Sequence, residues 1–150
     1  MHMAMWHPAY GGPTLPRKGG RLLRLYAKDI LVAIERATDR TWDEIAESLG
    51  KSGPALLRKL QQSEPNLSAP FFFKVVRAAR VSFADTTTKK EFISKLARAR
   101  ITKCMTHEDV AHRCGRSAWT VGKVLAGQQT PRLNTMLTLC DALDVPPTVR

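Results

Sequence analysis

Residues that commonly bind metal ions lie close together in the stretch HEDVAHRC, residues 107–114. His107, His112 and Cys114 carry the nitrogen and sulfur donors that zinc prefers. Zinc binding by a His-Glu-x-x-His pattern needs both histidines one helical turn apart on one face. His107 and His112 are instead five residues apart, which is about 140° around a helix. The spacing therefore argues against a metal site, and we expect no cofactor.

The same stretch has a counterpart earlier in the chain. TWDEIAESLGKSGPALLRKL (41–60) aligns with THEDVAHRCGRSAWTVGKVL (106–125) at an offset of 65, and FFKVVRAARV (72–81) aligns with MLTLCDALDV (136–145) at an offset of 64. Cys114 replaces Leu49 in this alignment, and Cys140 lies on an apolar stripe, so both are predicted to be small buried residues. Self-similarity of this kind indicates a duplicated unit.

Each copy carries signals for two short helices joined by a tight turn. A threonine cap is followed three residues later by an acid, a glycine ends the first helix, and a serine caps the second. In the first and second copies these residues are Thr41 and Thr106, Glu44 and Asp109, Gly50 and Gly115, and Ser52 and Ser117. Pro54 suits the first turn of its helix, and Ala46 and Ala111 are small where the helices must cross. The pattern predicts a helix-turn-helix in each copy.

The second copy, T-x-E-D-V-A-x-x-C-G-R-S-x-x-T-V-x-K-V-L-x-G at 106–127, resembles the Cro/C1-type (XRE-like) helix-turn-helix family. TPRLNTMLTLCDALDV after it is similar to the family's loop and fourth helix. The first copy, with T-W-D-E-I-A-x-x-L-G-K-S and LSAPFFFKVVRAARV, is a weaker match, because its loop QQSEPNLSAP departs from the usual Gly-x-x-x-Pro form. The resemblance covers roughly residues 22–145. It implies an all-α fold with two tandem lambda-repressor-like domains of about four helices each, at 21–84 and 87–146.

The remaining segments are predicted to be an arm, a first helix and a connection. Residues 1–20 are interpreted as a flexible basic arm that either lies on DNA phosphates or in the minor groove, or only adds solubility. The apolar spacing from Leu22 to Ile34 predicts an amphipathic helix that stops near Asp39. Ser82–Thr88 is predicted to be a polar connection between the copies, and no segment has the alternation of a strand.

The family resemblance implies which residues meet DNA, because its second motif helix lies in the major groove. The candidate base-contacting residues are Gly53, Pro54 and Arg58 in the first copy and Ala118, Trp119 and Lys123 in the second. The candidates for flanking contacts are Lys51, Ser52, Lys59, His107, Arg113, Arg116 and Ser117, with Arg17, Lys18 and Arg21 in the arm. His107 replaces the glutamine that the family often uses to hold a phosphate.

Two of these assignments leave alternatives open. Trp119 either packs against thymine methyl groups in the groove or folds back onto its own domain or a partner chain. Gly53 and Pro54 have no side chain that can hydrogen-bond a base, so the first copy contacts backbone, reads DNA shape or binds protein. We therefore expect the second copy to read sequence.

The charge of the chain points to a polyanionic partner. The net charge is +11, and residues 1–85 (13 basic, 8 acidic) and 86–150 (11 basic, 5 acidic) both contribute to it. Such a balance favours nucleic acid or an anionic surface. Three cysteines without CxxC spacing indicate a reducing, cytoplasmic setting, and neither a signal peptide nor an apolar run near ~20 residues predicts membrane insertion.

The sequence therefore favours a transcription regulator that binds double-stranded DNA, of bacterial, phage or mobile-element type and associated with the nucleoid. Two motifs on one chain could occupy successive major-groove segments about 34 Å apart. The alternative is an antitoxin-like or adaptor module in which one motif binds a protein. No catalytic constellation is present, so an enzyme is not expected. The oligomeric state is open between a monomer, a homodimer and a complex with a protein partner.

Overall fold

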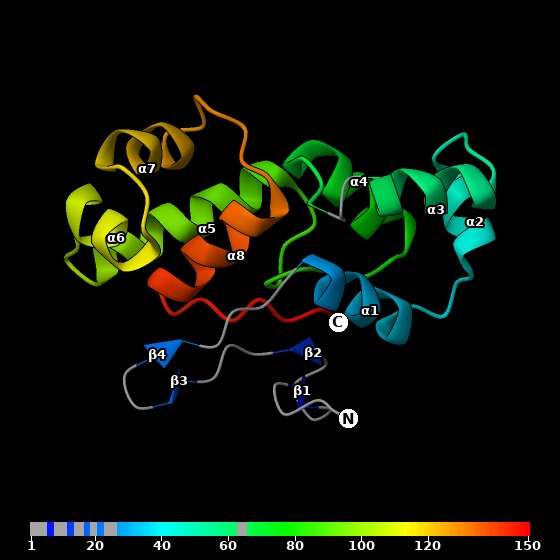
Figure 1. Cartoon of the computed structure of the whole chain (residues 1–150), viewed down its shortest axis with the longest axis horizontal. Coiled ribbons are helices and arrows are strands. Elements are labelled where there is room, and N and C mark those ends of the chain that lie inside the picture. The colour runs from blue at the N-terminus through cyan, green and yellow to red at the C-terminus, as the bar shows by residue number, and fades with distance from the viewer. Residues whose placement is uncertain (1–5, 8–11, 14–16, 19–20, 23–26, 63–65) are drawn as a thin grey trace.

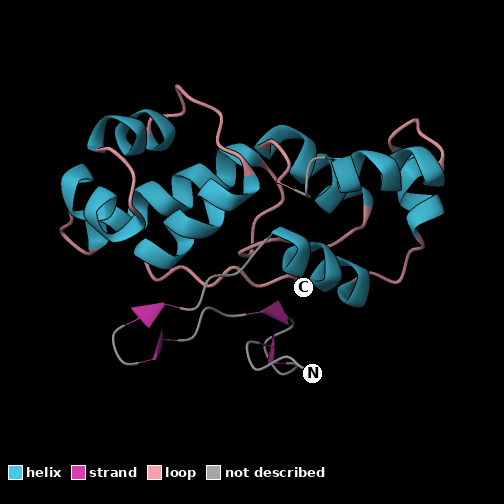
Figure 2. Ribbon diagram, in the orientation of Figure 1, coloured by secondary structure: helices cyan, strands magenta, loops and turns pink. Residues whose placement is uncertain are grey.

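The structure, a computed structural model, describes residues 6–7, 12–13, 17–18, 21–22, 27–62 and 66–150, with side chains from 27–60 and 66–150. Helices supply most of the core of this part of the chain, and Figures 1 and 2 show how they are arranged. They are α1 (Ala27–Ala37), α2 (Trp42–Ser48), α3 (Gly53–Gln62), α4 (Ala69–Ala78), α5 (Lys89–Thr102), α6 (His107–Cys114), α7 (Ala118–Leu125) and α8 (Leu133–Ala142). The predicted all-α class is confirmed.

The N-terminal segment contains short strands that the sequence did not predict. The strands are β1 (Trp6–His7), β2 (Gly12–Pro13), β3 (Arg17–Lys18) and β4 (Arg21–Leu22). β1 pairs antiparallel with β2, and β3 pairs antiparallel with β4. The prediction of an arm without strands at residues 1–20 is wrong for the six residues of β1, β2 and β3. A Gly-Gly dipeptide separates β3 from β4, and such a dipeptide favours a two-residue hairpin. The other arm residues lie outside the described part.

The first helix begins later than its apolar spacing predicts. Leu22 pairs with Arg17 in the β3–β4 ladder, so it cannot also open a helix. α1 begins at Ala27 and buries Ile30 and Ile34 completely. It ends at Ala37, two residues before the predicted stop.

The predicted capping boxes open α2 and α6. Thr41 Oγ1 accepts from the Glu44 amide at 3.2 Å, and the Thr41 amide donates to Glu44 Oε1 at 2.9 Å. Thr106 and Asp109 make the same reciprocal pair at 3.1 and 2.8 Å. Asp109 therefore closes the box despite its shorter side chain. Each box satisfies amides that have no partner within the helix.

The turn between the two motif helices also follows the prediction. Gly50 and Gly115 have φ of 71° and 68°, which side chains with a Cβ rarely adopt. Ser52 Oγ accepts from the Ala55 amide at 3.2 Å, and Ser117 Oγ accepts from the Thr120 amide at 3.0 Å. The second helix of each motif consequently begins directly after a tight turn. Ala46 and Ala111 are buried in the motif cores, where α2 packs against α3 and α6 against α7.

The helices recur along the chain with the offsets of the sequence repeat. α2 and α6 begin at 42 and 107, and α3 and α7 begin at 53 and 118, which are both 65 residues apart. α4 and α8 begin at 69 and 133, which is 64 residues apart. α1 and α5 end at 37 and 102, again 65 apart. Residues 27–78 and 89–142 thus contain the same succession of four helices.

A cluster of phenylalanines joins these two sets of helices. The Phe83 ring lies edge-on to Phe72, with centroids 5.0 Å apart, and 5.4 Å from Phe92 in α5. Phe73 in α4 also contacts Phe92, at 5.9 Å. All four rings are buried, so the hydrophobic core continues from the first set into the second. The predicted domain boundary near residues 84–87 stays a prediction.

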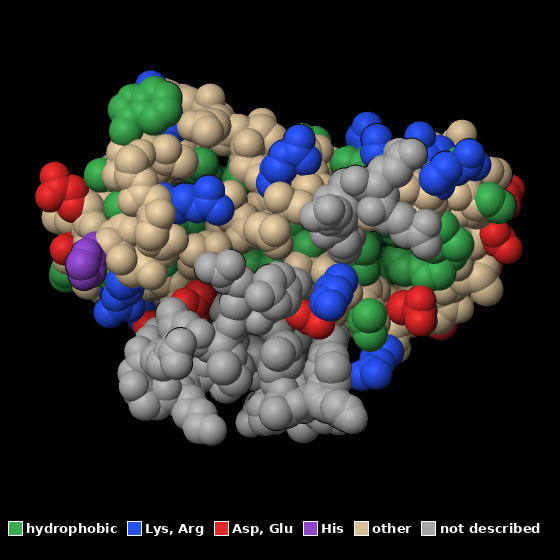
Figure 3. All heavy atoms as spheres, in the orientation of Figure 1, with side chains coloured by type: hydrophobic (Ala, Val, Ile, Leu, Met, Phe, Trp, Pro, Cys, Tyr) green, Lys and Arg blue, Asp and Glu red, His purple; other side chains and the backbone are tan. Residues whose placement is uncertain are grey.

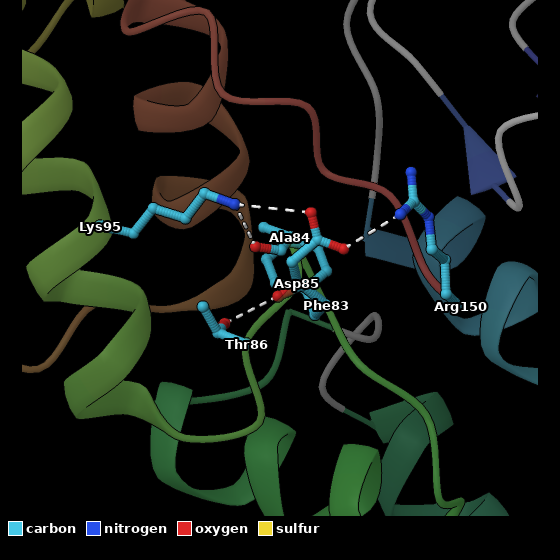
Figure 4. A network of polar contacts seen from close by, with 6 residues as sticks. All are labelled: Phe83, Ala84, Asp85, Thr86, Lys95 and Arg150. Carbon is cyan, nitrogen blue, oxygen red and sulfur yellow. Dashed lines mark hydrogen bonds and ion pairs between the residues drawn. The ribbon is translucent and has the colours of Figure 1, made fainter.

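The connection after α4 is part of this core. The sequence predicts a polar connection at Ser82–Thr88, but Phe83, Ala84 and Thr86 are buried. Their neighbours hold the turn, as Figure 4 shows: Lys95 Nζ donates to the Ala84 carbonyl at 2.7 Å, and the Asp85 carboxylate pairs with Lys95 and Arg150. The Ser82 and Arg150 backbones also exchange two hydrogen bonds, so residues 148–150 pack against the connection.

Candidate nucleic-acid interface

The turn before α7 and the first turn of this helix form an exposed surface. Arg116 and Ser117 are exposed, and Trp119 is 67% exposed, the largest fraction among the exposed large hydrophobic side chains of the described part. Hydrophobic atoms accordingly stand out over α7 in Figure 3. The αL conformation of Gly115 and the Ser117 cap fix the direction in which these side chains leave the backbone. Trp119 therefore does not fold back onto its own domain.

Lys123 lies one helical turn after Trp119 on the same face. Its Nζ is 5.4 Å from the centre of the Trp119 ring and donates to Gln128 Oε1 at 3.0 Å. The ammonium group is thereby held over an apolar ring, a cation–π arrangement. Arg116, Trp119 and Lys123 thus place two cations and one large ring on the surface of a single helix and its preceding turn.

Other predicted contact residues of the second motif have structural partners. The His107 ring lies against Gly122, where a Cβ would come within 3.1 Å of Nδ1. The glycine therefore lets α6 and α7 approach closely. Arg113 donates to the Ala142 carbonyl at 3.0 Å and lies 3.8 Å from Asp144, so it closes the carboxyl end of α8. Ala118 is half-buried against the core.

The corresponding surface of the first motif differs in charge and polarity. A Cβ at Gly53 would collide with the carboxylate of Asp43, so this acid lies against the first residue of α3. A carboxylate at a helix N-terminus stabilises the helix, but it also repels phosphate. Leu57 is 40% exposed on α3, and Pro54 is exposed near its start. Neither Leu57 nor Pro54 has a side chain that can hydrogen-bond a base edge.

Basic residues nevertheless surround α3. Arg58 and Lys59 are exposed and Lys51 is half-buried. Lys and Arg side chains gather over this end of the molecule in Figure 3. Lys59 Nζ lies 4.6 Å from the centre of the Phe71 ring, and Ser52 caps the helix as described. This arrangement suits contact with a phosphate backbone better than the reading of bases.

The arm residues Arg17, Lys18 and Arg21 are placed only as backbone. They lie in β3 and β4, and their side chains are outside the described part. Their contacts with DNA stay a prediction, as do those of the other candidate residues.

Several residues that shape these surfaces escaped the sequence interpretation. Gln128 holds Lys123 from beyond the end of α7, and Gly122 leaves room for the His107 ring. The carboxylate of Asp43, a residue of α2, lies against Gly53 at the start of α3. The sequence gives no sign that Gly122 contacts His107, and a glycine inside a helix by itself indicates only a lower helix propensity. The close crossing of two helices explains its presence instead.

The predicted environment of the cysteines is confirmed for Cys140 and corrected for Cys114. Cys140 is completely buried, and this burial raises the pKa of its thiol. Cys114 is only half-buried, at the edge of the core, because it ends a short surface helix. The described residues contain no group of three His, Cys, Asp or Glu side chains that could hold a metal ion. None of the described helices is long and apolar enough to cross a membrane.

Comparison with known families agrees with the geometry of the second motif. A family model described as a helix-turn-helix domain matches residues 91–150. This part of the chain is therefore similar to helix-turn-helix domains, which typically bind DNA. The matched residues include α6 and α7, the two helices of the predicted motif. Neither the curated proteins nor the solved structures yield a match.

Proposed function

We propose that the chain is a transcription regulator of the Cro/C1 type that binds double-stranded DNA through two tandem helix-turn-helix motifs. The observation that carries this proposal is the group formed by exposed Arg116, exposed Trp119 and half-buried Lys123 on the motif α6–α7, within the residues that the helix-turn-helix family model matches. The net charge of +11 supplies the attraction to phosphate. The repeated helix succession supports the other motif, the first along the chain, at α2–α3.

The second motif makes most of the sequence-specific contacts in this proposal. Arginine and lysine donate to guanine O6 and N7 in the major groove, and an apolar ring suits the thymine methyl group. Arg116, Lys123 and Trp119 provide these groups. The first motif contributes mainly phosphate contacts through Lys51 and Arg58, because α3 begins with Gly53 and Pro54, which cannot hydrogen-bond a base, and the Asp43 carboxylate of α2 lies against this end.

The decisive experiment is selection of bound sequences from a random duplex pool, followed by titration at several salt concentrations. We expect a defined sequence to be enriched. We also expect the affinity to fall steeply with salt, since each phosphate contact adds about 0.9 to the log–log slope. A pool that stays random after several rounds, with an affinity independent of salt, would refute the proposal.

One observation favours the alternative in which the first motif binds a protein. Leu57 is an exposed apolar residue on α3, one helical turn after Pro54, and neither side chain can hydrogen-bond a base. A protein recovered with the chain at a fixed ratio, and lost on Leu57→Lys, would support this alternative. If the Leu57→Lys chain retains all of its protein partners, the alternative fails. We place the chain in the cytoplasm, where its three free cysteines remain reduced, and we assign it no enzymatic activity.

A further inference from the structure

The loops that precede α4 and α8 pair with each other in a symmetric way. The Ala69 amide donates to the Pro131 carbonyl at 2.9 Å, and the Leu133 amide donates to the Leu67 carbonyl at 2.8 Å. Adding 64 to 67 and 69 gives 131 and 133, which is the offset of α4 and α8. Exchanging the two copies therefore converts each hydrogen bond into the other.

The residues that lie between these two hydrogen bonds, one in each loop, pair with each other. Ser68 and Arg132 form an isolated antiparallel bridge, and they are 64 residues apart, so each residue faces its own counterpart. A residue that contacts its own equivalent lies on a two-fold axis, because a head-to-tail arrangement places different surfaces together. Ser68 and Arg132 therefore mark a pseudo-two-fold axis inside one chain.

The helix contacts obey the same exchange. α4 packs against α8, and these helices are each other's counterparts. α4 also packs against α5, and the exchanged pair, α8 and α1, is in contact as well. The chain thus has the organisation of a two-fold symmetric dimer whose halves are covalently joined. α3 and α7 lie toward opposite ends of the long axis (Figure 1).

Two further bonds fix the axis without being symmetric. Asn66 Oδ1 accepts from the Asn134 amide at 2.9 Å, and Arg132 donates to the Asn66 carbonyl at 3.0 Å. Among the described residues, the positions 64 residues away form no equivalent hydrogen bonds. The bonds of Asn66 with Asn134 and Arg132 therefore hold the two loops together on one side of the axis only. Their removal would loosen the pairing while leaving both motifs intact.

We propose that one chain binds an inverted pair of non-identical half-sites, centred on the Ser68–Arg132 axis. This inference rests on the proposed function. The DNA duplex has local two-fold axes, and a two-fold protein presents its two recognition helices to opposite strands. A head-to-tail arrangement of motifs would instead favour a direct repeat. The half-sites differ because α7 carries Trp119 and Lys123, whereas α3 carries Leu57 and Arg58 at nearby positions.

The test uses the full chain and duplexes built from the sequence that is enriched by selection from the random duplex pool. The two half-sites are arranged inverted, direct or everted, with centres about one helical turn apart, and binding is followed by fluorescence anisotropy and native mass spectrometry. We expect one chain per duplex and an inverted arrangement preferred by at least about tenfold, the effect of one mismatched base pair. Equal or tighter binding of the direct repeat, or two chains per inverted duplex, would overturn the inference. A pool that yields no bound sequence would defeat the proposed function, and the inference with it.

A variant of the axis provides an independent measurement. The double substitution Asn66→Ala with Arg132→Ala should reduce the preference for the inverted over the direct arrangement, while binding to a single strong half-site is unchanged. Arg116→Ala is the matched control, because it should weaken all arrangements equally. An unchanged preference in the axis variant would show that the loop pairing does not set the orientation.

Discussion

The ammonium group of Lys123 is positioned over the ring of Trp119, 5.4 Å from its centre, and also donates a hydrogen bond to Gln128 Oε1. The side chains of Lys123 and Trp119 therefore form one continuous surface on α7. The position of the cation depends on the ring, so a change at Trp119 also affects Lys123.

Replacement of Trp119 by alanine should weaken binding to the selected duplex by about tenfold, because both the ring and the position of the cation are lost. Affinity for random duplex should change little. Since Trp119 is 67% exposed, the free energy of unfolding should change by no more than about 0.5 kcal/mol. Anisotropy titrations and urea unfolding measure the two quantities. A parallel loss of affinity for both duplexes would contradict a role in sequence reading.

The double substitution Arg116→Ala with Lys123→Ala should abolish specific binding without unfolding the protein. It removes the two cations next to α7 that are placed to meet bases or phosphates. The control is Lys28→Ala with Lys74→Ala, which removes the same charge from exposed positions of α1 and α4. If a fluorescence titration shows the same affinity for both double variants, the placement of the interface is wrong.

Asp43→Asn should strengthen binding to random duplex, because it removes a negative charge from the start of α3. Glu47→Gln provides the comparison, since Glu47 is an exposed acid of α2, the helix that also contains Asp43. We expect the Asp43 variant to bind about two- to tenfold more tightly than the Glu47 variant at low salt. Identical affinities would mean that this end of α3 does not approach DNA.

Phe83→Ala should lower the free energy of unfolding by about 3–5 kcal/mol, because a fully buried ring is lost from the cluster. The rings of both helix sets contact Phe83, so both sets should unfold in one transition. Single-tryptophan variants that retain Trp42 or Trp119 report on the two sets separately. Ile101→Ala, at a 64% exposed residue, is the control and should be nearly neutral. Two separated transitions in the unsubstituted protein would contradict a shared core.

The two capping boxes predict how the stability of the folded protein depends on pH. Hydrogen bonds from Thr41 and Thr106 lower the pKa of Glu44 and Asp109 below their ordinary values of 4.5 and 3.8. The charged forms are therefore favoured in the folded protein, and their contribution is complete above these ordinary values. It is lost as the pH falls through the lowered pKa of each group. The melting temperature of Asp109→Asn should consequently vary less than that of the parent between roughly pH 5 and pH 3. Equal slopes would exclude a contribution from this box.

Local signals predicted the motif helices well. Thr41, Thr106 and Ser117 cap helices because a side-chain oxygen and a nearby amide satisfy each other within a few residues. Such interactions depend on neighbours in the sequence, so the sequence alone reveals them. The start of α1 could not be predicted in the same way, because Leu22 is taken into a strand pair.

The candidate interface was predictable in part, since the motif register places Trp119 in the first turn of its helix, but the register left open whether the ring is exposed or folds back. The contacts of Arg113 with Ala142 and of Asn66 with Asn134 join residues 29 and 68 positions apart. No periodicity or cap encodes such pairs. The same reason explains Phe83, whose polar neighbours suggest an exposed connection although the core of both helix sets closes around it.

The covalent joining of the two halves has a genetic consequence. In an assembly of two identical chains, every codon change alters both recognition helices simultaneously. Here a change in Ala118–Leu125 leaves Gly53–Gln62 untouched, although both helices contribute to the same hydrophobic core. If both motifs bind DNA as we propose, each half can therefore acquire a new DNA preference one mutation at a time, while the other half continues to anchor the molecule.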